Sequence, residues 1–147
     1  MIQLLPIVLA QVALMAGGPV KAQCSPDLGQ DTWGNVGGGV ISLIDFGCQD
    51  VNRFSRTRHL PKAAPYRGMI HDRGAETVDS LMILVHEVGH IRHPESTEAC
   101  VKRYAVRHVG FFARGLGASR KTARRIVELA YAEWRIMPGN YRGCKKR

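Results

Sequence analysis

Residues 77–91 read Thr-Val-Asp-Ser-Leu-Met-Ile-Leu-Val-His-Glu-Val-Gly-His-Ile, and this stretch decides the expected fold. Eight of these residues are aliphatic or methionine, and they recur on all sides of a helix, which predicts a helix buried in the core. Thr77 or Asp79 can cap its start, and Pro94 marks its end. We therefore expect one central helix around which the rest of the chain packs.

Upstream of this helix, the sequence predicts mostly loops. Residues 23–39 are rich in glycine and other turn residues and are typical of a loop. Residues 40–44, Val-Ile-Ser-Leu-Ile, are apolar and β-branched and form the best strand candidate. Residues 51–75 are basic and polar and suggest further loops, with a short strand near Tyr66–Ile70.

Downstream of Pro94, apolar residues at helical spacing predict two more helices. The first runs from about Pro94–Thr97 to Gly115–Gly117, and the second from Ser119 to just before Pro138. The fold class is therefore α+β: a small β-sheet and a buried helix followed by two helices.

His86, Glu87 and His90 carry the chemistry of the central helix. Residues four apart share a helix face, with Cβ atoms roughly 5–6 Å apart, so both imidazoles can bind one metal ion, and imidazole is a good zinc ligand. Glu87 lies about 100° round the helix, where it can accept a proton from water that the ion activates. The alternative is a pair of hydrogen-bonded core histidines beside a surface glutamate. The motif has a chance expectation of roughly 0.01 in this composition, which favours the metal site.

A third ligand has four candidates downstream of the motif: Glu98, His93, Glu95 and His108. His93 shares the face of His86 and His90 but lies about 10 Å along the axis from His86, beyond easy reach unless the helix breaks first. Glu98 follows the break at Pro94 and starts the next helix, so a chain reversal can bring its carboxylate back to the ion. Glu98 is the favoured ligand, although a first-turn acid is also explained by the helix dipole.

The residues Val85-His-Glu-Val-Gly-His90 resemble the zincin metallopeptidases. The wider pattern over residues 77–144 resembles small secreted bacterial proteins that carry a metalloprotease motif; it includes Glu95-x-x-Glu-Ala, Tyr104-Ala and the Pro138, Tyr141 and Cys144 ending. This resemblance implies a catalytic helix beside a small sheet whose edge strand lines the cleft, with a third ligand from the next helix. Residues 40–44 are the natural candidate for that edge strand.

The N-terminal segment, residues 1–22, resembles a signal peptide cut after Ala22, because an apolar run is followed by helix breakers and small residues. No basic residue precedes the run, which departs from the usual pattern. A single membrane anchor is disfavoured, since the run is shorter than the ~20 residues that a bilayer span requires. A buried N-terminal core helix is the third alternative. Residues 23–147 then form a single zincin-like catalytic domain.

The four cysteines, Cys24, Cys48, Cys100 and Cys144, all follow the expected cleavage site and predict two disulfides. Of the three pairings, we favour Cys24 with Cys48 and Cys100 with Cys144, because each ties an end of the chain to the domain. Four free thiols in a reducing compartment and a four-cysteine zinc site are the alternatives, but no Cys-x-x-Cys pair supports the latter.

Positive charge is concentrated in residues 92–147, which hold 14 Lys and Arg against four Asp and Glu. Such a surface can contact anionic partners, although no nucleic-acid-binding motif is present and a solvated helix face explains the charge as well. The sequence therefore predicts a secreted Zn²⁺-dependent hydrolase, a metallopeptidase acting on peptides or proteins. The alternative is a non-catalytic, zinc-stabilised basic binding domain.

Overall fold

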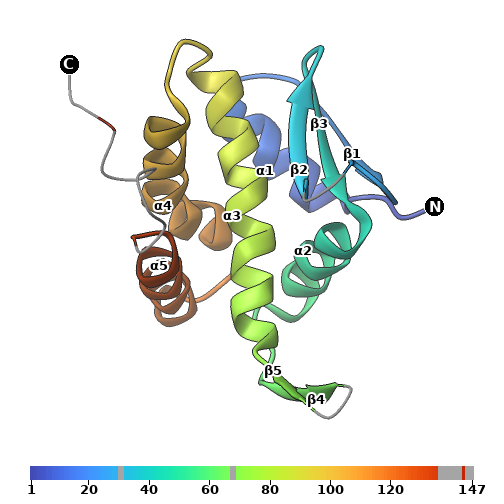
Figure 1. The fold of residues 1–147 in the computed structure, drawn as a ribbon, viewed down its shortest axis with the longest axis vertical. Helices are drawn as coiled ribbons and strands as arrows, with labels where there is room; N and C mark the ends of the chain where they lie inside the picture. Colours follow the sequence, from blue (N-terminus) through green and yellow to red (C-terminus); the bar gives the residue numbers. More distant parts are fainter. Residues whose placement is uncertain (30–31, 67–68, 136–143, 145–147) are drawn as a thin grey trace.

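The computed structural model describes residues 1–29, 32–66, 69–135 and 144 of the chain. These residues form five helices, a three-stranded sheet and a two-stranded hairpin, which confirms the α+β class. Helix α3 (Arg73–Arg92) runs through the middle of the molecule (Figure 1). Helices α1 (Pro6–Ala16) and α2 (Asp45–Thr57) and the sheet lie on one side of it, and α4 (Glu98–Gly115) and α5 (Arg120–Arg135) lie on the other.

Helix α3 begins four residues before the predicted start. The side chain of Asp72 accepts a hydrogen bond of 3.0 Å from the backbone N–H of Ala75, and this cap sets the first turn. The helix ends at Arg92, and the backbone N–H of His93 still donates to the carbonyl of Gly89. The predicted end before Pro94 is therefore confirmed.

The three-stranded sheet has the order β1-β3-β2. Strand β3 (Val40–Ile44) pairs in parallel with β1 (Lys21–Ser25) and antiparallel with β2 (Gly34–Gly37). The strand predicted at residues 40–44 is confirmed, but its expected place at the edge is wrong, because it is the central strand. The edge strand beside α3 is β2.

A glycine turn explains this correction. Gly38 and Gly39 have φ angles of 58° and 77°, and positive φ at both central residues suits the twist of a two-residue hairpin. The chain therefore folds back on itself, and Gly37 pairs with Val40. The prediction of a loop over residues 23–39 was wrong at both ends, where β1 and β2 lie.

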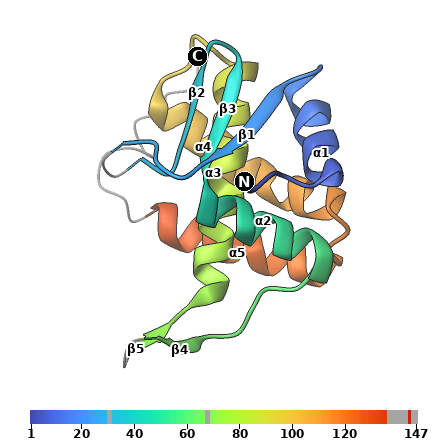
Figure 2. The ribbon, with the colours of Figure 1, turned by 90° about the vertical axis from the view of Figure 1, so that its right-hand side faces the viewer.

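The sequence did not predict helix α2, because residues 51–75 are basic and polar and indicate loops. Its buried face repeats at helical spacing and is formed by Gly47, Cys48, Val51, Asn52, Phe54 and Ser55. The short strand expected near Tyr66–Ile70 is instead a hairpin of β4 (Ala64–Tyr66) and β5 (Met69–His71). Figure 2 shows this hairpin extending from the N-terminal end of α3, away from the larger sheet.

Helices α4 and α5 match the two helices predicted downstream. The hydroxyl of Thr97 caps α4 by accepting from the N–H of Cys100 at 3.3 Å. The hydroxyl of Ser119 accepts from the N–H of Thr122 at the start of α5. The expected end of the last helix before Pro138 lies outside the described residues.

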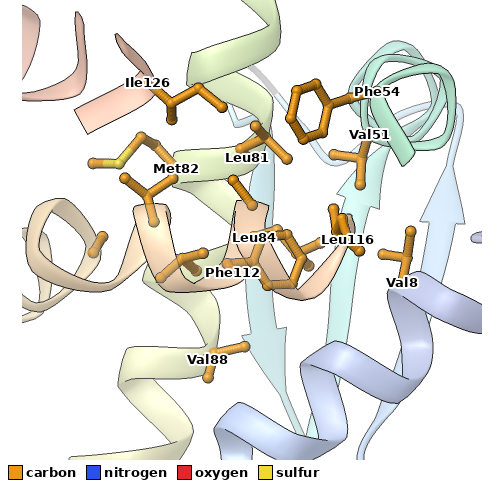
Figure 3. Packing of buried hydrophobic residues seen from close by; sticks show 14 of the residues in the cluster. Val8, Val51, Phe54, Leu81, Met82, Leu84, Val88, Phe112, Leu116 and Ile126 are labelled. Carbon is orange, nitrogen blue, oxygen red and sulfur yellow. The ribbon is translucent and has the colours of Figure 1, made fainter. Parts of the chain in front are cut away.

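One hydrophobic core joins all five helices to the sheet. Figure 3 shows Leu81, Met82, Leu84 and Val88 of α3 between side chains from the other four helices. The side chains that surround them are Val8, Val51, Phe54, Phe112, Leu116 and Ile126, all 1% exposed or less. Because α3 contributes to this core along its length, its position in the molecule is fixed by packing on several sides.

The N-terminal segment packs into this core as α1. Leu4, Val8, Val12 and Met15 are buried, and Asn52 of α2 holds the segment by accepting from the N–H of Leu5 and donating to the carbonyl of Gln3. This is the arrangement that the sequence favoured least. A cut after Ala22 would remove α1 and divide β1, and the signal peptide stays a prediction. No helix among the described residues has the length and apolar character needed to cross a bilayer.

Two disulfides connect the ends of the chain to the domain. Cys24 of β1 is joined to Cys48 of α2, and Cys100 of α4 is joined to Cys144. The favoured pairing is confirmed, and both the free-thiol and the four-cysteine zinc alternatives were wrong, because no cysteine is free. Two disulfides suggest an oxidising, extracytoplasmic location.

Candidate metal centre

Three side chains from two helices converge on one point. His86 and His90 lie one turn apart on α3, and their Nε2 atoms are 3.1 Å from each other. Glu98, in the first turn of α4, places one carboxylate oxygen 3.1 Å from Nε2 of His86 and the other 2.8 Å from Nε2 of His90. The structure therefore brings together the two predicted histidines and the favoured third ligand in a group that could hold a metal ion.

The spacing of these atoms fits a small divalent cation. Bonds of about 2.05 Å at tetrahedral angles place neighbouring ligand atoms about 3.3 Å apart, so the observed spacings need only a few tenths of an ångström of expansion. Two imidazole nitrogens and a carboxylate oxygen are also a donor set that zinc accepts. Without a cation, two ring nitrogens at 3.1 Å must share a proton as donor and acceptor.

The centre is buried on one side and open on the other. The side chain of His86 is 10% exposed, that of His90 is 25% exposed and that of Glu98 is 61% exposed. Burial lowers the pKa of His86 well below its ordinary value, which keeps the ring neutral and able to bind a metal ion. Three protein ligands with an exposed carboxylate leave room for a further, non-protein ligand.

Close packing of α4 on α3 positions Glu98. Gly89 lies between the two histidines, and a Cβ atom built on it would be 2.9 Å from side-chain carbons of both Val101 and Tyr104. Only glycine permits this approach without displacing the neighbouring helix. The break at Pro94 and the cap at Thr97 then return the chain so that the first turn of α4 faces the histidines.

Glu87 lies beside the metal centre but outside the ligand group. It is 6% exposed, and its Cγ lies 3.6 Å from the position of a Cβ built on Gly34, the first residue of β2. Burial, assisted by the negative charge of Glu98, raises the pKa of Glu87 to about 7. The charge of Glu98 acts on this carboxyl, and the role of Glu87 beside the ion stays a prediction.

The other candidate ligands lie elsewhere. The ring of His93 packs against Tyr104 with centroids 5.4 Å apart, and the ring of His108 stacks on the same tyrosine with centroids 4.0 Å apart. Nδ1 of His108 is also 2.7 Å from the carbonyl oxygen of Tyr104. Glu95 is exposed in the connection between α3 and α4. Among the described residues, only His86, His90 and Glu98 form a group with metal-ligand spacing.

Two features of the centre were missed from the sequence. Lys102 contributes a positive charge that acts on His86, and its position four residues after Glu98 on the same helix was a usable signal. Gly34 brings β2 against α3, since a Cβ there would collide with Ile83. A glycine inside a strand is a known sign of close backbone approach, but the turn residues around Gly34 predict a loop instead.

Comparison of the chain with protein-family models, with curated proteins and with solved structures finds no match in any of the three.

Proposed function

We propose that this protein is a zinc-dependent hydrolase and, more specifically, a metallopeptidase. The observation that carries the proposal is the convergence of His86, His90 and Glu98 with Glu87 buried beside them and outside the ligand group. Ordinary packing does not require two ring nitrogens and a carboxylate from another helix to meet within about one metal-ligand spacing, and the buried ring of His86 costs free energy unless it has a partner.

Each side chain has a role that follows from its place. Zinc, when bound, supplies a Lewis acid that polarises a carbonyl group and makes water a nucleophile near neutral pH. His86, His90 and Glu98 hold the ion. Glu87 accepts the proton from water and returns it to the leaving amine, and its burial beside β2 restricts the carboxyl to a small region next to the centre.

The edge strand favours a peptide as the substrate. Among the described residues, strand β2 pairs with β3 alone, so its other edge has no strand partner there and could accept an extended chain. Gly34 holds this strand against α3 next to Glu87. A peptide added to β2 as a further strand would therefore pass beside the metal centre, with its scissile carbonyl group close to the proposed base.

The alternative function, a non-catalytic zinc-stabilised domain, predicts a closed site. Structural zinc sites hold the ion with four protein ligands, whereas the described residues supply three, one of them largely exposed. The open site favours catalysis.

Secretion is part of the proposal. The two disulfides favour an oxidising compartment, and the segment before Gln23 resembles a leader sequence. We expect the mature protein to begin at Gln23, so the packing of α1 in the core belongs to the chain before the cut. Intact-mass measurement of exported protein tests this, and a mass that includes Met1 would contradict it.

The test of function compares Glu87→Gln with the parent on a library of fluorogenic peptides after loading with zinc. We expect Glu87→Gln to retain zinc but to hydrolyse about 10²- to 10⁴-fold more slowly, because an amide cannot accept the proton. Glu95→Gln is the matched control, since Glu95 is exposed and outside the ligand group, and it should be as active as the parent. Equal activity of Glu87→Gln and the parent would refute the assignment of the base.

A further inference from the structure

A groove lined by arginine and aromatic side chains lies on a face of α4 that the metal centre does not use. Cys100, Arg103, Tyr104, Arg107 and His108 follow the spacing of one helix face. Together with His93 and Ser96 from the connection to α3, and with Cys144, they line an open cavity of about 230 Å³. Glu98 belongs to a different face of the same helix.

A second cavity of about 310 Å³ adjoins the first, since His93, Tyr104 and His108 line both. This second cavity adds Arg92 from the last turn of α3, Phe111 from α4, and Leu14 and Met15 from α1. Its α1 side exists only in the chain that keeps residues 1–22, so the site proposed below is confined to the first cavity. Arg103 and Arg107 line the first cavity and Arg92 lines the second, and no carboxylate lines either of them in the part of the chain that the structure describes.

Within the described residues, Arg103 and Arg107 of α4 lack the acidic partner that two other arginines of this protein have. Arg125 pairs with Glu128, and Arg53 pairs with Asp50. Arg103 and Arg107 form no ion pair within the described ranges. Arg103 donates to the carbonyl of Cys144, but its Nε is buried and has no hydrogen-bond partner among those residues.

Tyr104 lines both cavities, beside the arginine side chains. Its ring packs edge to face on His93 and stacks on His108, so its position is fixed from two sides. Burial raises the pKa of Tyr104 although the charge of Arg92 opposes that shift, and its hydroxyl is therefore a donor at neutral pH. Guanidinium and hydroxyl donors around one cavity suit an oxyanion with several acceptor oxygens.

We infer that the groove formed by Arg103, Arg107 and Tyr104 binds a phosphate group. Phosphate accepts hydrogen bonds from several guanidinium groups at once, and its charge would compensate the positive charges that the groove lacks acids to neutralise. The volume of the first cavity fits a phosphate group with a small substituent. The site does not depend on zinc or on hydrolysis, because it shares no residue with the metal centre.

The test is calorimetric titration of the full chain with inorganic phosphate, and separately with O-phosphoserine, near physiological ionic strength. We expect at least one of the two to bind, and whichever binds more tightly identifies a free or an esterified phosphate as the ligand. Arg103→Gln combined with Arg107→Gln should weaken binding at least about tenfold, as expected for the loss of charged hydrogen bonds. Arg107→Gln alone, at an exposed position, tests the same point if the double variant folds poorly.

The matched control is Arg120→Gln combined with Arg124→Gln, which removes two exposed positive charges from α5. It should bind phosphate like the parent, because only the general electrostatic field changes. The His86→Ala variant should also bind phosphate normally, which separates this site from any binding at zinc. Failure of both probes to bind, or equal affinity of the α4 variants and the α5 control, would overturn the inference.

Discussion

Replacing Gly89 by alanine tests the helix contact that positions the metal centre. The new Cβ would be 2.9 Å from a carbon of Val101 and 2.9 Å from a carbon of Tyr104, closer than such carbons approach in folded proteins. Both neighbours belong to α4, so relief of the clash requires α4 to move away from α3. That movement would also carry Glu98 away from His86 and His90.

Two opposing effects determine the magnitude. Alanine is favoured over glycine inside a helix by about 0.8–1.0 kcal/mol. Overpacking of a closely packed contact costs about 1–3 kcal/mol. The contact should outweigh the propensity, giving a net loss of about 1 kcal/mol, or about 3 °C in melting temperature for a domain of this size. If the two helices did not approach closely at Gly89, Gly89→Ala would instead raise the free energy of unfolding.

Urea unfolding of the zinc-free protein measures this loss, and a double-mutant cycle with Val101→Ala locates it. Val101→Ala removes one of the two carbons that clash, so Gly89→Ala should cost less in that background than in the parent. Gly37→Ala is a control, since a Cβ there meets nothing within 4 Å. A Gly89→Ala protein that is about 1 kcal/mol more stable than the parent would refute the packing argument.

Three further outcomes are expected. Replacing both Cys100 and Cys144 by serine opens a loop with a sequence separation of 44 residues and should lower the free energy of unfolding by about 4 kcal/mol. Urea unfolding measures this loss, and a value below about 1 kcal/mol would contradict the chain-entropy argument. Burial raises the pKa of Asp50, so just above pH 3.8 the native state binds more protons than the unfolded state. The free energy of unfolding should therefore fall as the pH rises from 3.8 through the raised pKa. Asp50→Asn keeps an acceptor for the hydroxyl of Ser80 and should remove this slope, whereas an unchanged slope would assign it to another group. Gly34→Val should push β2 away from Ile83 and Glu87, and reduce peptide hydrolysis while zinc binding is retained; full activity would show that β2 does not help to position the substrate.

The parts of the molecule that the sequence predicted well are those with a strong local signal. The apolar run around His86 could only be a buried helix, and Pro94 fixed its end. Glu98 was favoured over His93, Glu95 and His108, because helix rise places His93 too far from His86 while the break at Pro94 allows the chain to return. The cysteine pairing followed from the need to tie each end of the chain to the domain.

The parts that were missed depend on tertiary contacts. The run Gly37–Gly39 is equally typical of a flexible loop and of a tight hairpin, and only the pairing of β2 with β3 distinguishes the two. The apolar face of α2 is narrow and interrupted by polar residues, so its helix is stabilised mainly by burial of Val51 and Phe54. The N-terminal segment has the composition of a leader and of a core helix alike, and its sequence alone does not separate them.

The central claim is that Glu98 completes a zinc site with His86 and His90. Its most direct test is the zinc affinity of the purified protein, measured by competition with a chromophoric chelator, for the parent, Glu98→Ala and the control Glu95→Ala. We expect one zinc per chain in the parent and in Glu95→Ala. Glu98→Ala should bind zinc more than about 100-fold more weakly than the parent. Loss of a residue that only holds a ligand in place by a hydrogen bond costs up to about 100-fold, so a larger loss identifies Glu98 as a ligand itself. Equal affinity of Glu98→Ala and the parent would contradict the account.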